Sequence, residues 1–243
     1  MAKQSKRNQR SYRKISKKVS SIILARGGSK GVPNKNKINF CGKPLVSWTI
    51  EQCIESGIDK DNIFVSSDSQ DILKIGNEYG VGSILRTPEV SGDNATSELS
   101  WIYSIDYLEK LGLNYDWIFA PQVTSPIREP SDIVNGLLMV DSGKYDSIFS
   151  AQKTDQCSLW KRSKDGLDSI GYDWRNRKRR QDNDVQYIEN GSFYMFKPDS
   201  IKKFNNRMYG NIGIVEMDQW KSFEIDSIDD LKLCSLVMRE YML

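Results

Sequence analysis

Leu24-Ala-Arg-Gly-Gly-Ser-Lys-Gly-Val-Pro-Asn-Lys-Asn36 is the stretch that decides the fold, and it directly follows the apolar run Ser21-Ile-Ile23. The run predicts a strand. The next residues include three glycines, an arginine and two lysines, and such a stretch cannot continue the β-sheet hydrogen bonding. The chain must therefore turn and expose backbone amides beside positive charge. We interpret the turn as an anion-binding loop that suits a polyphosphate. The residues concerned are Gly27, Gly28, Gly31, Arg26, Lys30 and Lys35.

The spacing of these glycines matches neither of the two common phosphate-binding patterns. A Walker motif needs Gly-x4-Gly-Lys-Ser/Thr and a dinucleotide fingerprint needs Gly-x-Gly-x-x-Gly. The alternative to an anion loop is a glycine-rich turn with incidental lysines.

The composition restricts the chemistry. The chain of 243 residues contains no histidine, which excludes Ser-His-Asp hydrolysis, Cys-His chemistry and His-ligated metals. Any metal must therefore bind oxygen ligands, which favours Mg²⁺ or Mn²⁺. The four cysteines (Cys41, Cys53, Cys157 and Cys234) form no Cys-x-x-Cys pair, so we expect free thiols in a reducing compartment.

The length fits one large domain or one domain with an inserted lobe. No apolar run approaches membrane-spanning length and no signal peptide is visible, so we expect a cytoplasmic protein without a membrane partner.

Charge is distributed unevenly along the chain. Eight of the 35 Lys and Arg residues fall within residues 1–20, which contain no acid, so 27 basic residues accompany 32 acidic ones in the rest. We expect residues 1–20 to be a disordered basic tail and residues 21–243 to form the domain. The alternative is that the tail binds RNA or an acidic surface, or directs the protein elsewhere.

Strand and helix patterns alternate over the first 150 residues. We expect helices at 44–57, 70–79, 95–111 and 131–140, and strands at 62–66, 83–86, 116–120 and 147–150. This alternation predicts an α/β fold, a Rossmann-like, mostly parallel sheet flanked by helices. Further strands are expected at 193–196 and Ile212–Met217, and a last helix at Ile228–Tyr241.

Polar residues follow the strands, where open α/β sheets bind their ligands. They are Arg26, Asp68, Arg86 and the segment Gln122-Val-Thr-Ser-Pro-Ile-Arg128. Asp68 could instead cap the next helix, and the segment ending at Arg128 could be a helix-entry turn.

The alternation fails between residues 152 and 188, where charged residues predominate. We interpret this part as an inserted lobe. Its run Trp174-Arg-Asn-Arg-Lys-Arg-Arg-Gln181 could be a solvated basic stretch, or an RNA-binding patch because Trp160 and Tyr172 lie nearby in sequence.

Two carboxylates precede the last helix. Glu224 and Asp226 are two residues apart, so in an extended segment they lie on one face, where a cation could relieve their repulsion. They are a candidate magnesium site. Asp229 and Asp230 are explained instead as first-turn helix acids.

Read together, these motifs resemble the acylneuraminate cytidylyltransferases, from about Ser21 to the C-terminus. The similar segments are the loop 24–36, residues 86–97, residues 122–128, Arg180-Gln181, Asn190-Gly-Ser-Phe-Tyr194 and Glu224-Ile-Asp226. The chain departs from the family at Leu24 and Val123, where members usually carry proline, and at Glu224, where they usually carry aspartate.

The resemblance implies CTP as donor, a nine-carbon 2-keto sugar acid as acceptor, and the CMP-sugar and pyrophosphate as products. It also implies a homodimer paired through the lobe, with Arg180 reaching the partner's cleft. The catalytic residues it implies are Arg26, Lys30, Lys35 and Asp226, with Asp226 and Glu224 on the metal. The nucleotide-binding residues are Ala25, Gly27, Gly28, Ser29, Asn36, Arg86 and Ser97, and the sugar-binding residues are Gln122, Arg180, Asn190 and Tyr194.

Two kinds of alternative remain at this point. The acceptor could be legionaminate, pseudaminate or 3-deoxy-manno-octulosonate. The chain could also be an RNA-binding or regulatory module that uses the nucleotide fold as a scaffold.

Overall fold

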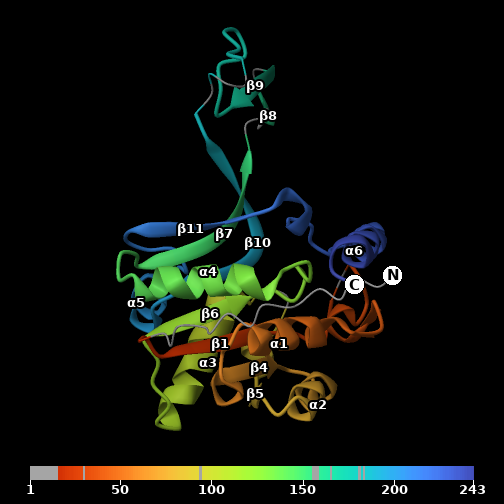
Figure 1. Ribbon diagram of the computed structural model, residues 1–243, viewed down its shortest axis with the longest axis vertical. Coiled ribbons are helices and arrows are strands. Elements are labelled where there is room, and N and C mark those ends of the chain that lie inside the picture. The colour runs from red at the N-terminus through yellow and green to blue at the C-terminus, as the bar shows by residue number, and fades with distance from the viewer. Residues whose placement is uncertain are drawn as a thin grey trace, which may run out of the picture.

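A seven-stranded sheet forms the centre of the protein (Figure 1). The computed structural model describes residues 16–29, 31–92, 95–154, 159–164, 166–179, 182 and 184–243. The strand order is β11-β7-β10-β6-β1-β4-β5, and only β10 runs antiparallel to its neighbours. The strands are β1 (Val19–Leu24), β4 (Ile63–Ser67), β5 (Gly82–Leu85), β6 (Trp117–Pro121), β7 (Ser147–Thr154), β10 (Gln186–Phe196) and β11 (Ile212–Met217). The predicted α/β fold with a mostly parallel sheet is confirmed.

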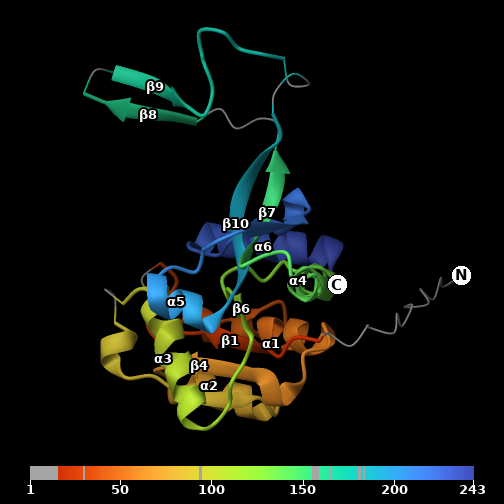
Figure 2. The same cartoon turned by 90° about the vertical axis from the view of Figure 1, so that its left-hand side faces the viewer.

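Helices cover both faces of this sheet (Figure 2). One face packs against α1 (Leu45–Glu55), α2 (Gln70–Glu78) and α4 (Pro130–Asp141), and α6 (Ile228–Tyr241) joins the same cluster. The other face packs against α3 (Ser97–Lys110) and α5 (Pro198–Phe204). No helix in the described ranges is both long and apolar enough to cross a membrane.

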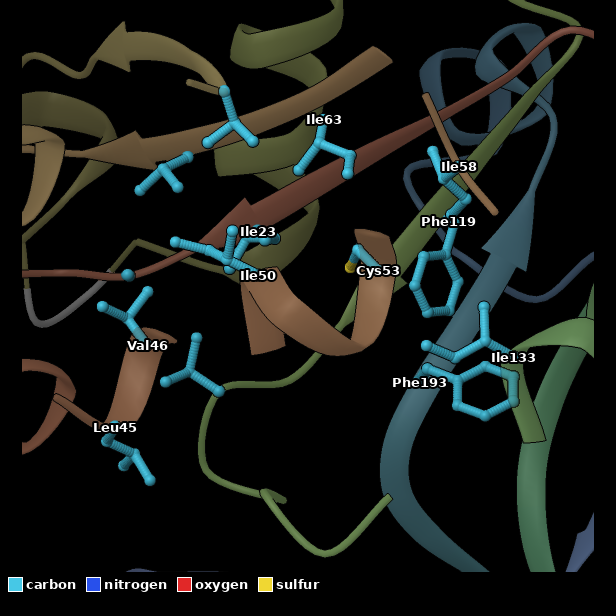
Figure 3. Packing of buried hydrophobic residues seen from close by; sticks show 14 of the residues in the cluster. Ile23, Leu45, Val46, Ile50, Cys53, Ile58, Ile63, Phe119, Ile133 and Phe193 are labelled. Atoms are coloured by element: carbon cyan, nitrogen blue, oxygen red, sulfur yellow. The ribbon is translucent and has the colours of Figure 1, made fainter. Parts of the chain in front are cut away.

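The first strand shows how the sequence produces two cores. Successive side chains of a strand point to opposite faces. Ile23 accordingly packs in the cluster with α1, which also contains Ile50 and Cys53 (Figure 3). The neighbouring Ile22 packs in the other cluster, with Trp101 of α3. A strand with both faces buried needs a continuous apolar run, which is what the sequence provides.

Strands β7 and β10 continue beyond the sheet as a two-stranded arm. Their pairing runs from Gln186↔Thr154 to Glu189↔Ala151, and the register shifts between Glu189 and Tyr194. The hairpin of β8 (Leu159–Ser163) and β9 (Gly166–Ile170) lies past the end of the arm (Figures 1 and 2). The described residues of the lobe expected at 152–188 include the ends of this strand pair, an almost wholly exposed hairpin and the irregular segment 171–179.

The start of the domain differs from the expectation. Val19 and Ser20, assigned above to the basic tail, are buried in β1. Val19 is opposite Trp117 in the ladder, and the Ser20 hydroxyl donates to the Asn62 carbonyl oxygen. The tail boundary at residue 20 was therefore wrong by two residues, and residues 1–15 lie outside the described part of the chain.

Trp101 is the largest fully buried side chain of the α3 face, where its ring contacts Phe196 at a centroid distance of 5.4 Å. Trp101→Ala should lower the free energy of unfolding by about 3–5 kcal/mol because a large cavity remains. Leu111→Ala, at a residue that is 60% exposed, is the control and should change it little. Urea unfolding followed by circular dichroism measures both, and equal effects would contradict this packing.

Candidate active site

A cavity of about 530 Å³ lies at the carboxyl end of β1. Four separate parts of the chain line it: the loop after β1, the segment from Arg86 to Ser100, the residues following β6, and Asp226. The sequence-predicted residues among its lining are Arg26, Ser29, Lys35, Asn36, Arg86, Ser97, Gln122 and Asp226. The topology therefore brings most of the predicted donor-side residues to one place.

The loop after β1 is fixed by hydrogen bonds from beneath. The Ala25 N–H donates to the Ser66 carbonyl oxygen at 3.0 Å, and the Gly27 N–H donates to the Asp68 carboxylate at 2.8 Å. The buried Asn36 side chain donates to the Arg26 carbonyl oxygen at 2.8 Å. Asp68 therefore holds the loop, whereas Ser69 is the N-cap residue of α2.

Lys35 joins this loop to the far end of the sequence. Its ammonium donates to the Ile225 carbonyl oxygen at 2.6 Å and to Asp226 Oδ1 at 2.9 Å. The Lys35 side chain is 12% exposed, but that of Asp226 is 72% exposed. The lysine is thus largely committed to holding the segment, while the Asp226 carboxylate still faces the cavity.

Gly31 is where the two segments touch. A Cβ atom at this position would lie 2.0 Å from the Asp226 carbonyl oxygen, whereas one at Gly28 would meet nothing within 4 Å. The glycine is needed for this close approach of two backbones.

Glu224 faces a second cavity of about 480 Å³, which Asn190 and Tyr194 also line. The Ser125 hydroxyl donates to Glu224 Oε1 at 3.3 Å. Burial, and then the nearby Asp226 carboxylate, raise the pKa of Glu224 above its ordinary value. The two acids flank the buried Ile225, whose N–H donates to the Thr124 carbonyl oxygen. They interact electrostatically but line different cavities.

Arg86 forms part of the wall of the first cavity. Its buried guanidinium donates to the Ser100 hydroxyl at 2.7 Å and to the Val90 carbonyl oxygen at 3.2 Å. Burial lowers the pKa of Arg86. It therefore braces the turn before α3, which begins at Ser97 and is capped by the Thr96 side chain.

Two of the predicted sugar-binding residues, Asn190 and Tyr194, lie at the bulge in β10, and a third, Gln122, bonds to it. The Gln122 N–H donates to the Ser192 carbonyl oxygen at 2.9 Å. The Tyr194 hydroxyl donates to the Glu189 carboxylate, and burial together with this bond raises the pKa of Tyr194. The Asn190 Oδ1 atom accepts from the Ser150 hydroxyl at 2.7 Å. Lys30 and Arg180 lie outside the described residues.

Sequence reasoning missed Lys221. Its buried ammonium lies 2.9 Å from Asp132 Oδ1 and 2.6 Å from Glu129 Oε2 at the start of α4. This ion-pair cluster holds the chain three residues before Glu224. No local pattern could have indicated it, because the partners are about ninety residues apart in sequence.

A sequence model described as cytidylyltransferase matches residues 20–236. The chain belongs to this family. It is 34% identical to the N-acylneuraminate cytidylyltransferase of Oncorhynchus mykiss, over 76% of this chain and 42% of that protein. It is also 34% identical to the enzyme of the same name from Streptococcus agalactiae, over 86% of this chain and 50% of that protein. The chain thus spans about half the length of these curated relatives.

Among solved structures, the chain resembles a CMP:2-keto-3-deoxy-manno-octonic acid synthetase complexed with CTP. The TM-score is 0.68 at 13% identity, covering 93% of this chain and all of that one. A 4-diphosphocytidyl-2C-methyl-D-erythritol synthase from Anaerococcus prevotii gives a TM-score of 0.66 at 14% identity, covering 92% of this chain and 96% of that one. These likenesses show the same fold.

Gly31→Ala should lower the melting temperature, because the new methyl group would push the loop away from the Asp226 backbone. Gly28→Ala is the matched control: the added methyl group meets open space, so its melting temperature should stay close to that of the parent protein. Differential scanning calorimetry of the ligand-free proteins measures both. A Gly31→Ala protein as stable as Gly28→Ala would show that the loop and this segment are not in contact.

Glu224→Gln should stabilise the ligand-free protein near neutral pH. The folded state holds the pKa of Glu224 above its unfolded value, so the charged form destabilises the fold above the folded-state pKa. Below the ordinary carboxyl range both states are protonated, and the gain should disappear. Melting temperatures from about pH 3 to pH 8 test this, with Glu216→Gln at an exposed site of β11 as control. A gain that is constant with pH would contradict it.

Proposed function

We propose that this chain transfers a cytidylyl group from CTP to an acidic nine-carbon 2-keto sugar, giving the CMP-sugar and pyrophosphate. The observation that carries the proposal is the first cavity, where Lys35 brings the glycine-rich loop against Asp226 in a member of the cytidylyltransferase family. Relatives named N-acylneuraminate cytidylyltransferase, at 34% identity, support this acceptor class.

The first cavity would bind the donor CTP, and we call it the donor half. It would act by positioning and charge neutralisation. Arg26, with Lys30 assigned from sequence, would hold the triphosphate against the loop amides. Lys35 would keep Asp226 beside it and add its positive charge. The acceptor hydroxyl oxygen would form a bond to the α-phosphorus, and the bond from that phosphorus to the bridging oxygen would break. Pyrophosphate would leave with the electron pair, and the hydroxyl proton would pass to solvent.

A magnesium or manganese ion fits the donor half on the evidence of its oxygen ligands. Mg²⁺ usually takes one or two carboxylates, with substrate phosphates and water completing its shell. Asp226 provides such a carboxylate, exposed to the cavity. The described part of the chain contains no larger cluster, of three or more acidic or cysteine side chains, that could hold a metal by itself. The ion would neutralise phosphate charge and increase the acidity of the acceptor hydroxyl. Glu224 lines the neighbouring cavity, so we propose that it does not bind the ion directly and acts on Asp226 only through its charge.

The acceptor half would be the second cavity and the adjoining Gln122. Asn190 and Tyr194 line this cavity with Glu224, and Glu189 holds the Tyr194 hydroxyl. A related acid is the second candidate acceptor, because the chain is 38% identical to a pseudaminic acid cytidylyltransferase from Campylobacter jejuni over 107 residues, 44% of this chain and 46% of that protein. Legionaminate, another nine-carbon acid, and the eight-carbon 3-deoxy-manno-octulosonate are the other 2-keto sugar acids to be tested.

The direct test incubates the pure protein with CTP, Mg²⁺ and a panel of these four acids. Pyrophosphate release is measured and the product is identified by mass. We expect a CMP-sugar from at least one acid and none when UTP or ATP replaces CTP. Failure to form any CMP-sugar, by protein that is folded and binds CTP, would contradict the proposal.

Asp226→Ala should lower turnover at least about a hundredfold, the usual scale for losing a principal electrostatic contact with a transition state. Steady-state rates at saturating CTP, sugar and Mg²⁺ measure this. Asp229→Ala is the control, because Asp229 is an exposed first-turn acid of α6 paired with Lys232. Near-normal turnover of Asp226→Ala would remove this carboxylate from the mechanism.

We further propose that the working form is a homodimer paired through the lobe. Apolar side chains gather on the exposed hairpin: Leu159 is 54% exposed, Trp160 47%, Leu167 58% and Ile170 45%. The ring centroids of Trp160 and Trp174 are 5.9 Å apart. The guanidinium carbon of Arg175 lies 4.2 Å from the Trp174 ring centroid. A second copy of the lobe would remove this apolar surface from water.

Mixing two inactive variants should restore activity if Arg180 serves the partner's cleft. Lys30→Ala damages the loop of its own cleft, and Arg180→Ala damages the residue lent to the other. In a mixed dimer one cleft would carry both lesions and the other neither, so activity should return to roughly a quarter of the parent value after random reassortment. No recovery, with subunit exchange confirmed by mass, would contradict a shared site.

A further inference from the structure

Arg128 is a buried cation that forms no salt bridge with any other residue in the described part of the chain. Its side chain is 0% exposed, and no carboxylate of the described residues lies within ion-pair distance of it. Its two terminal nitrogens donate to neutral groups: the Ser192 carbonyl oxygen, the Ser192 hydroxyl at 3.1 Å, Gln52 Oε1 at 3.1 Å and Thr49 Oγ1 at 3.4 Å. The Nε donor has no hydrogen-bond partner among the described residues. Burial lowers the pKa of Arg128 to about 10, which still leaves it charged at neutral pH.

Such a group is costly to bury. An apolar side chain of similar volume usually stabilises a core at least as well as a buried charge. The Arg128 guanidinium can hold several hydrogen-bond acceptors at once, which an apolar side chain cannot do. The acceptors that it holds indicate its role.

Ser192 is the centre of the bulge in β10. Its carbonyl oxygen accepts both from Arg128 and from the Gln122 N–H. The neighbouring Gly191 has φ +65°, and a Cβ atom there would lie 1.7 Å from Glu224 Oε1. The bulge thus abuts Glu224 on one side and carries Asn190 and Tyr194 on its two ends. Ser125 adds a bond of 3.4 Å from its hydroxyl to the Gly191 carbonyl oxygen.

We propose that Arg128 is the positioning residue of the acceptor half: by holding the Ser192 carbonyl oxygen it fixes the bulge, and so sets Gln122, Asn190 and Tyr194 at the spacing that the sugar acid requires. The proposal rests on the function proposed above. It assigns a specific kinetic role to a residue that touches neither substrate. Loosening the bulge should weaken binding of the sugar acid much more than binding of CTP. Gln122 also lines the first cavity, but the glycine-rich loop there is held by Asp68 and Asn36.

The test compares Arg128→Met and Arg128→Lys with the parent protein. Arg128→Met removes the fork at similar volume, and the KM for the sugar acid should rise about tenfold while the KM for CTP stays within about twofold. Arg128→Lys keeps the charge but cannot bond Ser192 and Gln52 together, so its shift should be intermediate. Ile63→Ala, a buried β4 site remote from the bulge, controls for destabilisation alone. It should reduce the active fraction without changing either KM.

Hydrogen exchange gives a second readout that needs no activity. In the ligand-free Arg128→Met protein, or in Arg128→Lys if the former does not fold, amides of residues 189–194 should exchange faster, with residues 22–29 unchanged. Unchanged exchange at the bulge, or equal rises in both KM values, would overturn the positioning role. If the parent protein forms no CMP-sugar, the proposed function fails, while faster exchange confined to the bulge would still support the structural part of the proposal.

Discussion

The Lys35 ammonium joins two segments about 190 residues apart, and the candidate site depends on that contact. It donates to the backbone of Ile225 and to the carboxylate of Asp226, so the first loop of the sheet and the last irregular segment form one wall. The lack of a side chain at Gly31 allows their backbones to touch. Among the described residues, Asp226 is the carboxylate that this contact brings to the cavity beside the loop amides and their positive charge.

Much of the fold could be predicted from the sequence because its signals are local. The bounds of β11 and α6 agree with the prediction, and α6 begins with a capping box between Ser227 and Asp230. The missed elements lack such signals. Helix α5 has only seven residues, and β8 and β9 bury almost nothing, so neither shows a clear apolar period. The early start of β1 was missed because Val19 and Ser20 follow a basic run without a break.

The sequence indicated many of the residues that line the first cavity, but not the buried contacts that support them. Part of the anion loop lines one cavity with Arg86, Gln122 and Asp226, since parallel strands end at one edge of the sheet. The sequence indicated these residues by their place after strands and by the family resemblance. The division of Glu224 and Asp226 between two cavities was not predictable, because spacing alone put both on one face. Lys221 was missed because its partners are distant in sequence. Arg128 was expected among the polar residues of the ligand edge, but it is fully buried and holds Ser192 instead. The positions of these four side chains depend on tertiary packing, which local sequence patterns do not show.

A crystal structure with CTP and Mg²⁺ would test the central claim most directly, because the claim concerns where one molecule binds. We expect the triphosphate against the amides of residues 26–31 with Lys35 and Asp226 beside it, and the cytosine between the loop and the segment from Arg86 to Ser97. A nucleotide bound elsewhere, with Asp226 remote from any phosphate, would contradict the account.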